Sequence, residues 1–301
     1  MKTLKSANRR LGMAMVILSS TVFGIVPLLM IRCYALGANS TTFLIVRSLI
    51  VLLVLMPASG LHKHPLELWK SSWPTVLFLS FTSTATTLLL FEAYKYIPTG
   101  LVTTIHFMYP TVVTVICLLF FHEAATKQKM ICVALCFIGV LLLGGQGGEL
   151  RVEGILMAAI SSLTYSLYII GADRLPLGNL TELQLMFSLE LCNLFLVACL
   201  YGPVTGMVHV ELPLSGWLQL ALFAAIHGLL GQLMFLFGVR RIKAQLASIA
   251  STLEPITSIL MGFLFLQESI SLPMLTGSAL ILASIAISAQ KESPEKRRAG
   301  R

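Results

Sequence analysis

Charged residues are scarce in this chain of 301 residues. Asp, Glu, Lys and Arg together make up 11% of it, less than half of the roughly 25% found in an average soluble domain. Apolar residues make up 56%, and the mean hydropathy is +0.88. This composition excludes an ordinary soluble domain and predicts a protein embedded in a lipid bilayer.

The sequence also lacks the motifs of several catalytic and cofactor-binding classes. Its six cysteines show no Cys-x-x-Cys spacing, so we interpret them as small apolar packing residues and not as metal ligands or disulfide partners. The glycine-rich stretch 144–148 is not followed by the Lys-Ser or Lys-Thr of a phosphate-binding loop, and we interpret it as a flexible linker. We therefore predict neither a metal nor a cofactor.

Long apolar runs are abundant. A helix that crosses a bilayer needs about 20 mostly apolar residues, and the chain contains ten candidates. They cover residues 11–32, 42–59, 72–93, 99–121, 130–146, 153–172, 183–202, 215–238, 244–266 and 272–289. The predicted fold class is an all-α polytopic membrane protein with ten transmembrane helices.

The two halves of the chain resemble each other. An offset of 145 residues places Tyr109-Pro110 on Glu254-Pro255, and an offset of 142 places Gly12 on Gly154. Five spans per half is an odd number, so the second half enters the membrane from the opposite side. The sequence therefore predicts two inverted five-helix repeats with a binding site between them. The predicted domains are a first repeat over 1–147, a second over 148–290 and a basic cytoplasmic tail over 291–301.

Basic residues predict the orientation, because Lys and Arg accumulate in short loops on the cytoplasmic side. With the amino terminus inside, 17 of the 21 Lys and Arg residues lie in inner segments. We therefore expect a multi-pass protein of the cell membrane with both termini in the cytoplasm. The cations lie in separate short loops and form no continuous patch, which argues against a nucleic-acid partner. The lipid bilayer is the expected surrounding of the chain.

Proline interrupts two of the predicted spans at equivalent positions. Pro110 and Pro255 each lack an N–H donor and clash with the carbonyl group four residues earlier. We therefore predict that both helices are kinked and expose backbone acceptors near the middle of the bilayer.

Polar side chains accompany both kinks. His106 and Tyr109 share a helix face near the first proline, and Ser251 and Glu254 share one near the second. Such groups are costly in hydrocarbon unless they face partners or water, so we predict that these four bind a solute. The alternative is that the prolines only curve their helices while the hydroxyl groups bond to their own backbone.

Two further polar residues inside spans complete the predicted substrate site, each with an open alternative. Arg47 either holds the solute or pairs with a carboxylate, for which Glu190 is a candidate. His227 either faces the cavity or bonds to a neighbouring helix.

The repeated motif resembles the EamA family of the drug/metabolite transporter superfamily. Each half has a mid-helix proline followed thirteen residues later by a glutamate, Glu123 in the first half and Glu268 in the second. The resemblance covers nearly the whole chain. It implies a ten-helix fold, cytoplasmic termini and a central cavity used for export of amino acids or other small metabolites. The first half departs from the acidic-Pro pattern, with Tyr109 where Glu254 stands in the second.

These observations predict a secondary transporter and not an enzyme. We expect it to export a small metabolite such as an amino acid by alternating access at a midplane site between the repeats. A membrane-embedded enzyme or a receptor-like protein is the alternative. The expected partner is a small-molecule solute, while protons as a coupling ion and a homodimeric assembly are left open.

Overall fold

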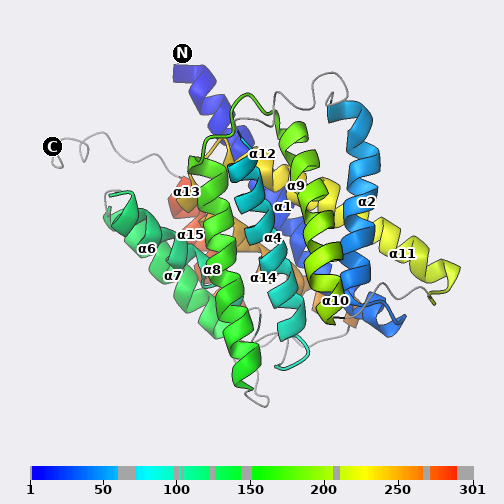
Figure 1. Cartoon of the computed structure of the whole chain (residues 1–301). Coiled ribbons are helices and arrows are strands. Elements are labelled where there is room, and N and C mark those ends of the chain that lie inside the picture. Colours follow the sequence, from blue (N-terminus) through cyan, green and yellow to red (C-terminus); the bar gives the residue numbers. More distant parts are fainter. Residues whose placement is uncertain are drawn as a thin grey trace.

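The computed structural model describes most of the chain (Figure 1). The described residues are 2–59, 72–97, 102, 105–122, 126–143, 151–205, 211–266 and 272–289. The predicted linker 144–148, the basic tail 291–301, Glu123 and Glu268 lie outside these residues.

Every regular element in the described part of the chain is a helix. The first half contains α1 (Lys2–Ala35), α2 (Ser40–Ser59), α4 (Trp73–Ala93), α6 (Tyr109–Phe120) and α7 (Lys127–Leu143). The second half contains α8 (Val152–Arg174), α9 (Glu182–Leu196), η1 (Val197–Tyr201), α10 (Gly202–Thr205), α11 (Leu214–Ala224), η2 (Ala225–Gln232), α12 (Leu233–Val239), α13 (Ala244–Ser251), α14 (Leu253–Leu266) and α15 (Leu272–Ala289).

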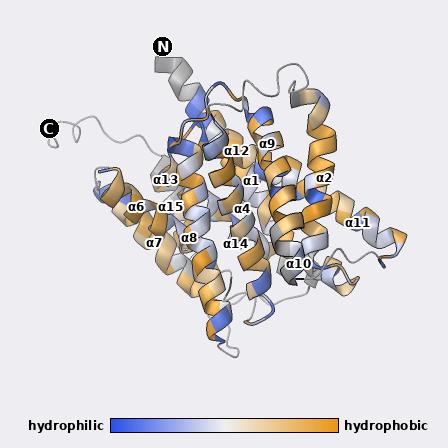
Figure 2. Cartoon of the chain, viewed as in Figure 1, coloured by the Kyte–Doolittle hydropathy of each residue, from blue (hydrophilic) through white to orange (hydrophobic). Residues whose placement is uncertain are grey.

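The helices have the length and composition of membrane spans. Seven helical segments among the described residues are long and apolar enough to cross a bilayer, and they coincide with seven of the ten predicted spans. The other three predictions fall on α6, α7 and α15, where the described apolar helices are shorter. Hydrophobic residues dominate the helices, while many hydrophilic residues lie at helix ends (Figure 2). Large apolar side chains such as Leu53 and Phe120 also face outward, as expected for contact with lipid.

Helices of the two halves pack against one another in matched pairs. α7 packs along α15, and α2 packs along α9. α4 packs along α8, and the corresponding contact joins α12 and η2 to α1. In the same way, α6 contacts α8 and α14 contacts α1. Exchange of the two halves therefore converts the α7–α15 and α2–α9 contacts into themselves and each of the others into a contact that the structure contains.

Two glycines, one in each half, have corresponding side-chain neighbours. A Cβ atom at Gly12 would lie 2.8 Å from Cβ of Arg241, and one at Gly154 would lie 2.9 Å from Cβ of Tyr96. Tyr96 and Arg241 are separated by the same 145 residues as the two prolines. Both sites need a residue without a side chain because two helices approach closely there.

The helices break next to the two prolines. The fourth expected span is not one continuous helix, since turn residues at 107–108 precede α6, whose first turn contains Pro110. In the second half α13 ends at Ser251, and α14 begins at Leu253 with Pro255 in its first turn. Proline is tolerated in a first turn because its missing N–H would have no partner there anyway. Each proline thus begins a new helix instead of bending a continuous one.

The eighth expected span also departs from a regular α-helix. Its middle, η2, is a π-helical segment of eight residues between α11 and α12. Such segments are rare and often occur at functional sites, because the extra residue redirects neighbouring side chains.

Candidate functional site

A cavity with about 100 Å³ accessible to water lies between the two halves. The first half contributes residues of α1 and α4 together with His106, and the second contributes residues of α8, η2, α12 and α14. The cavity is lined by Phe23, Val26, Ser83, Thr86, Thr87, Leu90, Phe91, Tyr94, His106, Tyr165, Tyr168, His227, Gln232, Phe235 and Glu254.

His106 lies at the helix break before α6. Its Nδ1 is 2.9 Å from Oγ of Ser161 on α8, and that hydroxyl group donates to the carbonyl oxygen of Ala158 at 2.7 Å. Because a serine hydroxyl has only one proton, Nδ1 of His106 must be the donor to Ser161. The neutral imidazole is then left with Nε2 as a hydrogen-bond acceptor.

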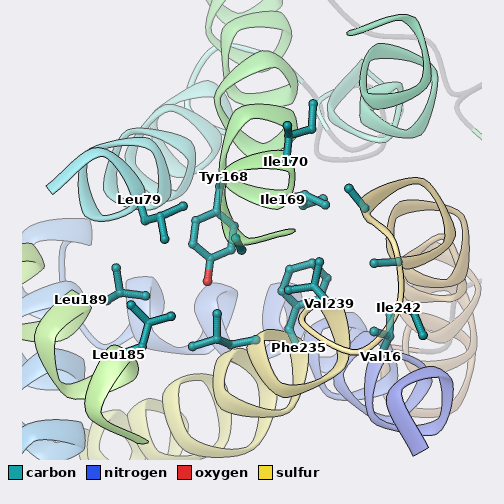
Figure 3. Packing of buried hydrophobic residues seen from close by; sticks show 14 of the residues in the cluster. Val16, Leu79, Tyr168, Ile169, Ile170, Leu185, Leu189, Phe235, Val239 and Ile242 are labelled. Atoms are coloured by element: carbon teal, nitrogen blue, oxygen red, sulfur yellow. The ribbon is translucent and has the colours of Figure 1, made fainter. Parts of the chain in front are cut away.

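Aromatic rings form one wall of the cavity. The ring of Phe235 lies 5.8 Å from the ring of Tyr165 and 6.2 Å from that of Tyr168, both in stacked orientation. Tyr168 extends from α8 among Leu79, Leu189 and Phe235, with its hydroxyl at the tip (Figure 3). That hydroxyl is buried and has no hydrogen-bond partner in the described part of the protein. The wall is therefore apolar with a polar group available for a ligand.

The π-helical segment brings two polar side chains to the cavity. Nε2 of Gln232 donates to Oγ of Ser83 at 3.4 Å, which leaves Oε1 of Gln232 buried without a partner among the described residues. Nδ1 of His227 is also buried and unpartnered there. Gly231, in the same segment, lets Phe23 pack against its backbone, since a Cβ atom would lie 2.5 Å from Cε1 of Phe23. Buried polar atoms without partners are rare in proteins, so these positions are candidates for ligand contacts.

Three of the residues predicted from the sequence line this cavity, namely His106, His227 and Glu254. Tyr109 lies behind the lining, with its ring 5.5 Å from that of His106 and 4.8 Å from that of Tyr165. Ser251 is buried as well.

The hydroxyl group of Ser251 donates to the carbonyl oxygen of Ala247 at 2.8 Å. It thus makes the bond to its own helix that the sequence left open as an alternative.

Arg47 is paired with a carboxylate and is not part of the cavity lining. Nη2 of Arg47 lies 3.2 Å from Oε1 and 3.3 Å from Oε2 of Glu190, and Oγ of Ser48 donates to Oε2 at 2.6 Å. The side chains are 2% and 0% exposed. Of the two roles that the sequence allowed for Arg47, the contacts support the ion pair, which connects α2 of the first half to α9 of the second.

Several polar residues of the lining were not among the candidates from the sequence, including Tyr165, Tyr168 and Gln232. A signal for the tyrosines was present, because they lie three residues apart inside a predicted span, away from the interfacial zone that usually holds tyrosine. No comparable signal identified Gln232, since its direction depends on the π-helical segment.

Comparison with known proteins places the chain in a family. The sequence profile of the EamA-like transporter family matches residues 10–145 and again residues 152–290. The chain belongs to the EamA-like transporter family. It is accordingly a multi-pass membrane protein of a family whose members are transporters.

Individual relatives agree with this assignment. The uncharacterized transporter YvbV of Bacillus subtilis (strain 168) is 27% identical over 83% of this chain and 83% of its own length. Protein PecM of Dickeya dadantii (strain 3937) is 26% identical over 66% of this chain and 67% of its own length. A crystal structure of another protein aligns with a TM-score of 0.74, covering 98% of this chain and 99% of that one at 18% identity. At that identity the likeness concerns the fold alone.

Proposed function

We propose that this EamA-like protein is a secondary transporter that exports a small metabolite across the cell membrane by alternating access. The cavity is the observation that carries the proposal. It lies between the two halves and takes its lining from both, so a relative movement of the halves would change access to it. In this proposal ten spans form two inverted repeats, and both termini are cytoplasmic.

The matched helix contacts support the inverted arrangement. Contacts that exchange when the halves exchange are expected of two structures with nearly equal energies, in which the repeats swap conformations. The breaks at 107–108 and after Ser251 lie at corresponding places and supply positions where the chain can bend.

Five of the six candidate residues have a proposed role at this site, and Arg47 is not one of them. His106, His227 and Glu254 contact the solute directly, since all three line the cavity. Tyr109 and Ser251 lie next to them and shape the site from behind. Glu254 is also proposed to exchange the proton that couples transport to a pH gradient, because a carboxyl group can bind and release one within a cavity.

Counterflow in liposomes tests the transport proposal. Purified protein would be reconstituted, loaded with one unlabelled solute and presented with radiolabelled amino acids, amines and other small metabolites outside. We expect time-dependent accumulation of at least one labelled solute, recovered chemically unchanged. Recovery of a chemically altered product would instead support the alternative of a membrane-embedded enzyme, and folded protein that moves no solute would support a receptor-like role.

A further inference from the structure

We propose that the cavity selects small organic ammonium ions that carry an aromatic or apolar body and no carboxylate. This inference rests on the proposed function, because it names the chemical class of solute that the same cavity would take. The charge, the hydrogen-bonding capacity and the aromatic surface of the lining residues all favour such a ligand.

Among the described residues, the lining has a carboxyl group and neither a Lys nor an Arg to balance it. Glu254 is the carboxyl group among the described lining residues, and neither Lys nor Arg occurs among them. Arg47, a buried cation of the same bundle, is already paired with Glu190. A ligand with a positive charge would therefore gain a favourable partner in the cavity, whereas a carboxylate would meet Glu254 with no cation nearby.

Buried hydrogen-bond acceptors occur among the lining residues, together with the hydroxyl group of Tyr168, which can donate or accept. Oε1 of Gln232 is a buried acceptor, and the amide nitrogen of the same side chain donates to Ser83. Nε2 of His106 is an acceptor, because the proton on Nδ1 is bonded to Ser161. Nδ1 of His227 is unpartnered within the described residues and can accept when it carries no proton.

Two threonine hydroxyl groups of α4 in the lining donate to their own helix. Thr86 donates to the carbonyl oxygen of Thr82 at 2.7 Å, and Thr87 donates to that of Ser83 at 3.1 Å. An alkylammonium group has three donors and no acceptor, which suits this arrangement, while a carboxylate needs donors. The polar part of the site is therefore complementary to an amine in its charged form.

The aromatic wall suits both parts of such a ligand. The stacked rings of Tyr165, Tyr168 and Phe235 offer an apolar surface to the body of the ligand. The faces of aromatic rings also attract cations within about 6 Å. With about 100 Å³ accessible to water, the cavity suits a ligand of modest size.

Three probes that share a phenyl ring test the assignment: phenethylamine, phenylalanine and phenylacetate. Phenylalanine differs from phenethylamine by its carboxylate, and phenylacetate lacks the ammonium group. Binding would be measured by titration calorimetry on the purified full chain in detergent, with thermal melts to verify that the protein is folded. We expect phenethylamine to bind about 10- to 100-fold more tightly than phenylalanine, because the carboxylate must be buried without a partner. We expect phenylacetate to bind more weakly still.

Two variants locate the charge that is recognised. Glu254→Gln should weaken phenethylamine binding by about 10- to 100-fold, the loss of one charge-assisted hydrogen bond. Glu153→Gln, the same change at an exposed site in the first turn of α8, should leave it unchanged. If Glu254→Gln does not fold, the comparison of the three probes on the natural chain still decides the matter.

Several results would overturn the assignment. They are equal or tighter binding of phenylalanine or phenylacetate, unaltered phenethylamine binding by folded Glu254→Gln, and folded natural protein that binds no phenethylamine. Transport of labelled probes in liposomes separates this inference from the proposed function. Selective binding of phenethylamine without transport of any probe would contradict the transporter and leave the ligand class standing. Transport of the carboxylates in preference to the amine would contradict the ligand class and support the proposed transport function.

Discussion

The buried pair of Arg47 and Glu190 offers a quantitative test of how the two halves are held together. Both side chains are almost fully buried, so replacing one leaves the other as an uncompensated charge. Arg47→Met and Glu190→Met should therefore each lower the free energy of unfolding by about 3–5 kcal/mol. The double variant replaces the pair with apolar side chains of similar length and should lose less than about 1 kcal/mol.

The expected coupling energy follows from these values. The two single losses sum to at least about 6 kcal/mol, so the double variant should fall short of additivity by about 5 kcal/mol or more. Reversible unfolding in mixed micelles with increasing dodecyl sulfate, followed by circular dichroism, measures all four proteins. The double variant should also retain phenethylamine binding, because neither residue lines the cavity.

An exposed ion pair supplies the matched control. Nζ of Lys95 lies 2.8 Å from Oε1 of Glu92, closer than the atoms of the buried pair, but the Lys95 side chain is 52% exposed. Lys95→Met should therefore change stability by less than about 1 kcal/mol. The buried ion pair would be refuted if the stability losses of the two single variants sum to that of the double variant within about 0.5 kcal/mol. Loss of ligand binding by a stable double variant would instead place Arg47 in the binding site.

Three further predictions concern the site and the topology. His106→Ala should weaken ligand binding about tenfold, the loss of one hydrogen bond, as measured by calorimetry on protein whose melting temperature is unchanged; an unaltered affinity would remove His106 from the site. Glu254→Gln should reduce the response of net transport to an imposed pH gradient while solute exchange persists, and an unchanged response would assign coupling to another group. A cysteine at position 147 on a cysteine-free background should react with a membrane-impermeant maleimide added outside intact cells, because an odd number of predicted spans precedes it; labelling only after the inner face is exposed would reverse the topology.

The sequence predicted several properties of the fold that depend on local chemistry. Composition alone indicated the membrane, because a chain with 11% charged residues cannot cover a soluble surface. The positions of the helix breaks were also predictable, since proline at 110 and 255 alters the backbone whatever surrounds it. Even so, the sequence suggested kinks within continuous helices, and the structure instead begins a new helix at each proline. Whether the helix bends or ends at a proline depends on the turn that precedes it.

Tertiary packing decided which polar residues meet. His106 and Glu254 were found from the sequence because they lie beside the breaks, but Tyr165 and Tyr168 become part of the site only through the rotation of α8 against α4 and α12. Hydrophobic periodicity could not predict that rotation, because the lipid-facing and protein-facing sides of a membrane helix are both apolar.

Arg47 and Gln232 differ in how far their local sequence predicts their surroundings. Arg47 was recognised as costly to bury, a property of the residue itself. Glu190, 143 positions away, was a candidate partner from the sequence, and only the packing of α2 on α9 brings the two into contact. Gln232 drew no attention in the sequence, and the π-helical segment directs it to the cavity. The sequence by itself determined the medium, the duplication and the sites of helix breakage, because these follow from composition, from the similarity of the two halves and from a local backbone restriction. The tertiary structure decided which residues line the cavity, because a side chain's surroundings depend on how separate helices rotate and pack.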